Sequence, residues 1–182
     1  MRHWVFPGNT VDVTTVAQVK EDLKGWQLTR CLFVGDAGMV SQANFQALAK
    51  GGGKYLMAMP MRRGDEVTEA VLSRPGRYRK IADNLEVKEV VVGDGERRRR
   101  YAVCFNPQEA RRQRAHRDER IRELEAELAC LADQDEGGHS KRVCALRSSA
   151  RYGRLLKETK RGLAIDRQAI AELERFDGKF VV

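Results

Sequence analysis

No two cysteines of this sequence are spaced closely enough to form a C-x-x-C motif. The four cysteines stand at positions 31, 104, 130 and 144 of 182 residues. A structural zinc site needs four ligands at a characteristic spacing, and Cys130, His139 and Cys144 leave one ligand missing. We therefore expect free thiols and no zinc site.

Long apolar runs are absent as well. The opening residues MRHWVFPGNT lack the apolar stretch of a secretory signal peptide. No segment approaches the roughly 20 apolar residues that span a bilayer. The glycines at 51–53 precede Lys54 and Tyr55, whereas a phosphate-binding loop has Ser or Thr after its lysine. These absences favour a cytoplasmic setting without a membrane segment.

Positive charge is what the sequence has in excess. Lys and Arg number 34 against 26 Asp and Glu, for a net charge of +8, and 24 of the 34 are Arg. The planar, permanently charged guanidinium group pairs well with phosphate. A codon bias towards Arg in a GC-rich genome would produce the same excess, so composition alone leaves both explanations open.

Residues 1–61 alternate between short apolar runs and helical patterns. The apolar runs predict three strands, at 3–6, 29–35 and 54–60. One predicted helix ends near Lys24, and a second begins after its cap, Ser41. The candidate caps of the first helix are Thr10, Asp12 and Thr14. The resulting order β-α-β-α-β predicts an α/β fold with helices packed against a sheet.

Residues 62–182 have a different pattern. The GDGE turn between strands at 85–92 and 98–105 predicts a β-hairpin. Asn106, Pro107 and Glu109 are typical of a helix start, with Glu109 reaching back to the cap amide. That helix should run to about 133 and carry a narrow apolar seam, which needs a partner helix. The remaining predicted elements are a short helix at 66–72, a turn at 133–140, the partner helix at 141–160, a strand at 163–165, a helix capped by Asp166 and a final strand within 177–182.

Asp36 is the strongest candidate for a functional carboxylate. It directly follows an apolar strand and is flanked by Gly35 and Gly38, which allow backbone or substrate to come close. Ligands of sheet proteins bind in the crevice beyond the carboxyl ends of strands. From the residues alone, Asp36 is a structural turn or helix cap, a metal ligand or a phosphoacceptor. The last role requires an acidic pair after a first strand, which the sequence lacks.

The arginines of 97–122 are candidates for contact with nucleic-acid phosphate. Arg97, Arg98, Arg99 and Arg100 lie in a predicted strand, where side chains alternate between faces, so at most half can meet one ligand. Four arginines of the following helix fall mostly along one side, namely Arg111, Arg114, Arg117 and Arg122. A solvated ionic helix accounts for them equally well, and both interpretations stay open.

Three stretches together resemble the insertion-sequence DDE transposases of the IS-four-like group. They are VFPGNTVDVTTV, FVGDAGMVSQANFQALAKGGGKYLMAMP and ERFDGKFVV, in the order and at the spacing of that family. The resemblance implies a ribonuclease-H-like core in which three carboxylates hold two divalent metal ions, usually Mg²⁺. These ions act in the cleavage and strand transfer of DNA. Asp36 maps onto the family's second catalytic Asp, which implies that it is catalytic and a metal ligand.

Two of the three family carboxylates have no counterpart in these 182 residues. The first Asp is expected upstream of WVFPGNT, and the Glu several tens of residues beyond DGKFVV. Asp12 belongs to the GNT motif and is expected to cap a helix instead. Because Mg²⁺ demands near-octahedral oxygen ligation and binds weakly to one carboxylate, we expect this polypeptide alone neither to cut nor to join DNA.

The resemblance also divides the chain. It implies a partial ribonuclease-H-like core at 1–61, an inserted β-hairpin with long helices at 62–175, and a return strand at 176–182. The implied partner is DNA at insertion-sequence ends, in the bacterial cytoplasm and associated with the nucleoid. The alternative is a non-catalytic basic module that binds nucleic acid or self-associates as a homo-oligomer through its helical hairpin. Open strand edges predict marginal stability outside 85–175.

Overall fold

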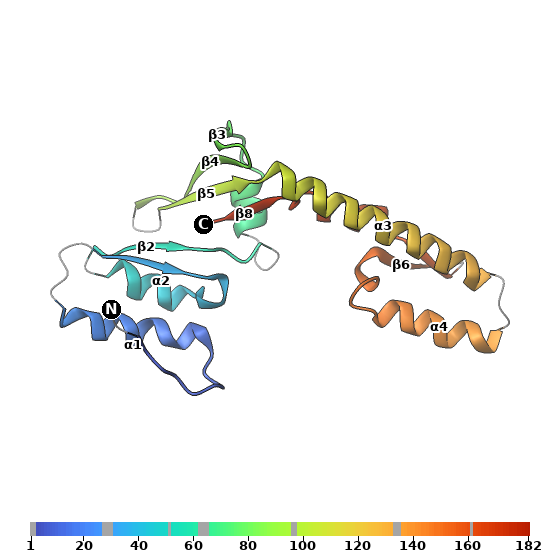
Figure 1. Ribbon diagram of the computed structural model, residues 1–182, viewed down its shortest axis with the longest axis horizontal. Coiled ribbons are helices and arrows are strands. Elements are labelled where there is room, and N and C mark those ends of the chain that lie inside the picture. Colours follow the sequence, from blue (N-terminus) through green and yellow to red (C-terminus); the bar gives the residue numbers. More distant parts are fainter. Residues whose placement is uncertain are drawn as a thin grey trace. The chain divides into compact units, whose positions relative to one another are not determined.

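The computed structural model describes residues 3–26, 31–50, 52–61, 66–95, 98–132, 136–160 and 162–182, apart from the side chains of 66, 68, 132 and 136–140. The chain forms two compact units (Figure 1). The first unit is Met1–Cys104 with Phe180–Val182, and the second is Phe105–Lys179. These boundaries rest on packing and leave the family-based boundaries at 61/62 and 175/176 as a prediction.

The first unit begins with a small parallel β-α-β arrangement. Strands β1 (Leu32–Gly35) and β2 (Lys54–Met57) pair in parallel, from Leu32 opposite Lys54 to Gly35 opposite Met57. Helices α1 (Asp12–Lys24) and α2 (Gln42–Ala49) lie against one face of this pair (Figure 1). Buried Val16, Phe45, Leu48 and Met57 form the core between them. The α/β class predicted from the sequence is therefore confirmed.

Two details at the start of the chain differ from the prediction. Residues 3–6 belong to no strand; instead Trp4 Nε1 donates to Asp22 Oδ2 of α1 at 2.7 Å. Helix α1 starts after Val11, which makes no side-chain cap. None of the candidate caps acts as one, because Thr14 donates its hydroxyl to Val11 O and Asp12 is already the first helical residue. Of the predicted strand 29–35, residues 29 and 30 lie outside the described residues.

A four-stranded sheet in the order β3-β4-β5-β8 completes the first unit. Its strands are β3 (Arg79–Ala82), β4 (Leu85–Val92), β5 (Arg99–Phe105) and β8 (Lys179–Val181). Strands β4 and β5 are neighbours, as the predicted hairpin requires, and Gly93 in their turn has a φ of 79°. The backbone of Ala102 exchanges two hydrogen bonds with Val182, and Met59 N donates to Val181 O at 2.8 Å.

The short helix predicted at 66–72 is present as η2 (Glu66–Leu72). It is a π-helix whose Val67 and Val71 are buried in this unit's second core.

The second unit is built on α3 (Pro107–Ala132). Asn106 caps it, because its Oδ1 accepts from the backbone N–H groups of Gln108 and Glu109 at 3.0 and 3.1 Å. The Glu109 carboxylate does not reach back to the cap as predicted. It accepts from Arg112 on the same helix, and the amide of Asn106 donates to Gly178 O at 2.7 Å instead.

The predicted partner helix is shorter than expected and starts earlier. Helix α4 covers Glu136–Ser148, and residues 133–135 of the predicted turn lie outside the described residues. Strands β6 (Leu156–Thr159) and β7 (Gly162–Ile165) form an antiparallel pair. Gly153 lies at the break in the helical path, where a Cβ would be 2.5 Å from Arg147 O. The apolar seam of α3 therefore packs against α4, this strand pair and α5 (Arg167–Glu174) together, through the buried residues Ile121, Leu124, Leu131, Leu146, Leu155 and Ile170.

Candidate functional site

Asp36 lies at the carboxyl end of β1, the position predicted from the sequence. It caps the short 3₁₀-helix η1 (Ala37–Met39), and its Oδ1 accepts from Gly38 N at 2.9 Å. The side chain is exposed, and its Oδ2 makes no hydrogen bond to any residue that the structure describes. The capping interpretation of Asp36 is thus confirmed. One carboxylate oxygen remains open to solvent or to a ligand.

A second carboxylate faces the same place. A methyl group added at Gly38 would lie 3.2 Å from Asp36 Oδ1 and 3.4 Å from Asp12 Oδ2. Asp12 stands in the first turn of α1, which packs beside η1. The absence of a side chain at Gly38 therefore leaves the two carboxylates on either side of one small space. Sequence reasoning assigned Asp12 to a cap and missed this proximity.

These carboxylates do not amount to a two-metal site. Mg²⁺ takes near-octahedral oxygen ligation, and a pair of ions needs several carboxylates. Within the described ranges, no group of three or more His, Cys, Asp or Glu side chains is placed to hold a metal ion. The residues present do not fit the full metal complement of the family, so no reaction step is assigned to metal here. The side chain of His139, one of the zinc ligands considered, lies outside the described residues.

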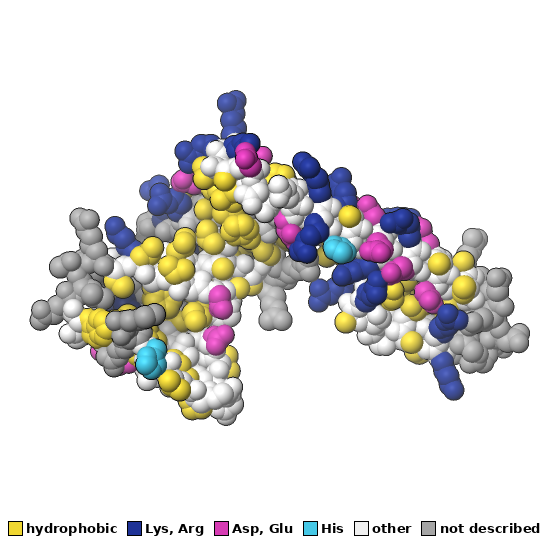
Figure 2. Space-filling view, in the orientation of Figure 1, with side chains coloured by type: hydrophobic (Ala, Val, Ile, Leu, Met, Phe, Trp, Pro, Cys, Tyr) yellow, Lys and Arg dark blue, Asp and Glu magenta, His cyan; other side chains and the backbone are white. Residues whose placement is uncertain are grey.

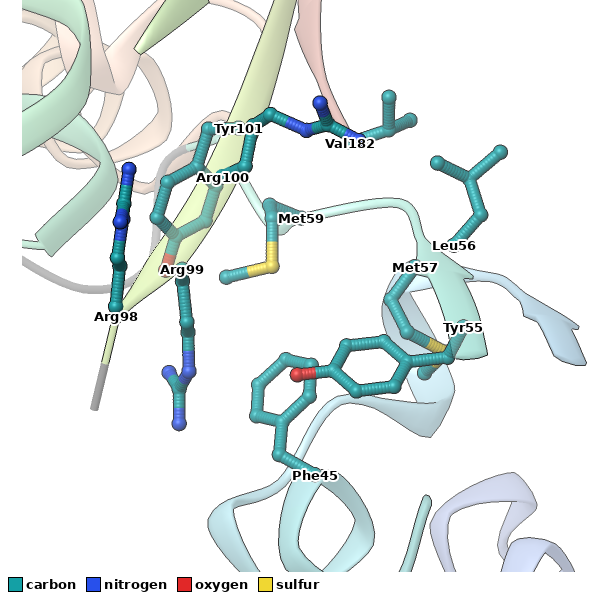
Figure 3. Close-up of a pocket in the computed structure, with 10 residues that line it drawn as sticks. All are labelled: Phe45, Tyr55, Leu56, Met57, Met59, Arg98, Arg99, Arg100, Tyr101 and Val182. Carbon is teal, nitrogen blue, oxygen red and sulfur yellow. The ribbon is translucent and has the colours of Figure 1, made fainter. Parts of the chain in front are cut away.

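The arginines before and within β5 border a pocket of about 230 Å³ in the first unit (Figure 3). Arg98, Arg99 and Arg100 come from one side, and the rings of Phe45 and Tyr55 come from the other. Arg97 lies outside the described residues. As strand alternation predicts, the three differ in exposure, since Arg99 is half-buried and its two neighbours are exposed.

Arg99 contacts both Phe45 and Gln42. Its guanidinium carbon lies 4.4 Å from the centroid of the Phe45 ring, within the range of a cation–π interaction. Its Nη2 donates to Gln42 Oε1 at 2.8 Å. Arg100 is 3.9 Å from Glu89 Oε2, a loose and exposed pair. Arg98 and Arg100 therefore present their charge to solvent at a pocket that the rings of Phe45 and Tyr55 also line.

The helix arginines divide into two kinds. Arg111, Arg114 and Arg122 are exposed on α3, where Figure 2 shows basic side chains at intervals. Arg117 is only 7% exposed and is bound by Asp177 and Glu174. Its pKa is raised, mainly by the hydrogen bonds to Asp177. The prediction that Arg117 contacts DNA phosphate is therefore corrected, because its guanidinium is buried and already paired.

The burial of Arg117 could have been predicted from the sequence. Arg117 precedes Ile121 and Leu124 by four and seven residues, so it extends the buried stripe of the helix. The position of Lys179 could not be predicted from any sequence pattern. It lines a pocket together with Arg111 and Arg114. That pocket depends on residues more than sixty positions apart, which no local pattern brings together.

The fold is that of an α/β protein with an exposed carboxylate, Asp36, at the end of a parallel strand. Arginines also stand exposed before and within β5 and along α3. The model of the family "Transposase DDE domain" matches residues 3–127, more than half of the chain. The chain belongs to this family, so the prediction of a DDE transposase is confirmed, whereas the IS-four-like group stays a prediction. The match contains Asp36 and all the candidate arginines.

No similar protein was found among curated proteins, and none among solved structures. DDE transposase domains as a family use divalent metal and act on DNA in transposition. Among the helices that the structure describes, none is long and apolar enough to cross a membrane.

Proposed function

We propose that this chain is part of a DDE transposase of the IS-four-like group, which cleaves DNA phosphodiesters and transfers strands at the ends of an insertion sequence. The observation that carries this proposal is the exposed carboxylate of Asp36 at the carboxyl end of β1, inside the matched segment. Asp36 is the proposed catalytic residue and metal ligand. Residues 1–61 and 176–182 are the proposed partial ribonuclease-H-like core, and 62–175 the proposed insertion.

The 182 residues alone are proposed to be inactive. Asp36 is the residue that corresponds to a family carboxylate, and the structure places the Asp12 carboxylate near it across Gly38. Two carboxylates leave too few oxygen ligands to fix two Mg²⁺ ions in the family's geometry. The purified chain should give no nicking or strand transfer with Mg²⁺ on DNA carrying insertion-sequence ends. Cleavage that disappears in Asp36→Ala would overturn this part of the proposal.

DNA is the proposed partner, bound in the bacterial cytoplasm and nucleoid. The exposed cations proposed to meet phosphate are Arg98, Arg100, Arg111, Arg114 and Arg122, and the proposal also includes Arg97 and the half-buried Arg99. Binding through phosphate releases counterions, so affinity should fall steeply with salt. Fluorescence anisotropy of a labelled duplex between 50 and about 200 mM salt tests this. An affinity that does not change with salt would contradict it.

A self-associating module is the second candidate. The face of the β1–β2 pair opposite the helices carries Leu32 and Val34, which are 58% and 67% exposed, and Leu56. A group of exposed aliphatic side chains on one face of a strand pair favours association between chains. Light scattering measures the oligomeric state, and the anisotropy assay measures DNA binding. A homo-oligomer that binds no DNA would favour this second candidate.

A further inference from the structure

A pocket of about 350 Å³ lies within the second unit. One wall is the first two turns of α3, with Ala110, Arg111 and Arg114. The opposite wall is the segment after α5, with Asp177 and Lys179. Phe105 and Pro107 add an apolar side.

The segment after α5 is fastened to α3 at several points. Arg117 binds the Asp177 carboxylate with both terminal nitrogens, at 2.8 and 2.7 Å. Gly178 N donates to Gln113 Oε1 at 2.9 Å, and Gly178 O accepts from Asn106 N at 2.7 Å. The glycine fits so closely that a Cβ would be 2.4 Å from Asn106 O. Both walls of the pocket are therefore held in place before any ligand binds.

The charge left in the pocket is positive. Its two carboxylates, Asp177 and Glu174, are both bound by the buried Arg117. Arg111 and Arg114 are exposed, and neither makes an ion pair or hydrogen bond to another residue that the structure describes. Lys179 adds a third cation and donates to Arg175 O at 2.8 Å. Arg117 thus offsets part of this acidic charge, and the four cations against two carboxylates leave a net charge of about +2 around the pocket.

The arrangement suits a tetrahedral dianion or monoanion of phosphate size. Two guanidinium groups three residues apart on a helix project side by side, and each presents donors that match two phosphate oxygens. The apolar side offers a surface for a sugar, and contacts to phosphate and sugar carry no direct base information. We propose that this pocket binds one phosphodiester of a nucleic-acid backbone through Arg111, Arg114 and Lys179, without base specificity. This inference deepens the proposed function and rests on DNA being the partner.

The test uses the full chain and charge-matched variants. The double variant Arg111→Gln/Arg114→Gln removes the pocket's arginines. The control Arg120→Gln/Arg154→Gln removes the same charge from two exposed arginines outside the pocket. Circular dichroism checks that both remain folded. Anisotropy with labelled poly-dT and poly-dA oligonucleotides, over a salt series, gives affinity and the slope of log K against log salt. Calorimetry with inorganic pyrophosphate measures whether the chain binds a small free anion.

We expect the pocket variant to bind both oligonucleotides about tenfold more weakly, the order expected for lost charge-assisted hydrogen bonds. Its salt slope should fall by about 0.7, the value for one single-strand phosphate. Equal affinities and slopes for the pocket variant and the control would overturn this inference and leave DNA binding intact. If the wild-type chain bound pyrophosphate but no oligonucleotide, the nucleic-acid assignment and the proposed function would both fall.

Discussion

Arg117 and Asp177 are sixty residues apart in the sequence and form a two-point ion pair in the second unit, with nitrogen–oxygen distances of 2.8 and 2.7 Å. Their side chains are 8% and 13% exposed. The pair joins the middle of α3 to the segment that leads into β8. Arg117 Nε is buried without a hydrogen-bond partner among the described residues, so the two terminal nitrogens do the binding.

Replacing Arg117 should destabilise the fold strongly. Arg117→Ala leaves the nearly buried Asp177 carboxylate without its partner, and breaking a buried pair in this way costs about 3 kcal/mol. Urea unfolding followed by circular dichroism measures the loss. The control is Arg112→Ala, which removes an exposed ion pair between Arg112 and Glu109 on the same helix. This change should lower the free energy of unfolding far less. Equal losses in the two variants would show that the buried pair has no special role.

Substituting Gly178 tests the close fit between the same two segments. Gly178 has a φ of +64°, and a Cβ there would be 2.9 Å from Ala110 N as well as close to Asn106 O. Gly178→Ala therefore combines a strained backbone, which costs about 1 kcal/mol, with a clash against main chain. Gly52→Ala is the matched control, because Gly52 has a φ of +74° with nothing within 4 Å. Thermal unfolding should show the larger loss for Gly178→Ala, and the reverse order would count against the contact.

Lys20 should stabilise the end of α2. Its Nζ donates to the carbonyl oxygens of Leu48 and Lys50, both at 3.0 Å, and to that of Ala47. Carbonyl groups at a helix end otherwise lack partners. Lys20→Met keeps the aliphatic chain and removes these bonds, at a cost of about 2 kcal/mol for hydrogen bonds to a charged group.

Hydrogen exchange measured by mass spectrometry should show faster exchange over residues 42–50 in Lys20→Met. Lys24→Met serves as the control, since Lys24 is exposed and pairs with Glu21 on its own helix. Unchanged protection of α2 in Lys20→Met would refute the capping role.

The four cysteines should differ in reactivity. Cys104 is buried, and burial raises the pKa of its thiol, whereas Cys31, Cys130 and Cys144 are exposed. Because the thiolate is the reactive form, a raised pKa keeps Cys104 protonated and unreactive to a higher pH. A disulfide reagent at pH 8 should modify three thiols quickly and the fourth only after urea is added. A Cys104→Ser variant identifies the slow thiol, and four equal rates would contradict the burial.

Short-range rules predicted much of this structure. Ser41, Asn106 and Asp166 each accept hydrogen bonds from backbone N–H groups of the helix that follows, as their residue types predict. The position of Asp36 at the end of an apolar strand was also readable, because the chain itself places adjacent residues together. The Arg-rich run in β5 and along α3 needed only composition and period to be found.

The sequence by itself determined most of the local elements, the caps Ser41, Asn106 and Asp166, the position of Asp36 and the DDE transposase family. Only the tertiary structure decided what distant residues do to one another. It buried Arg117 against Asp177, brought Lys179 beside Arg111 and Arg114, placed Asp12 near Asp36 across Gly38, and paired β6 with β7. The physical reason is that helix and turn preferences act within a few residues, whereas burial and ion pairing depend on which surfaces meet after the chain has folded.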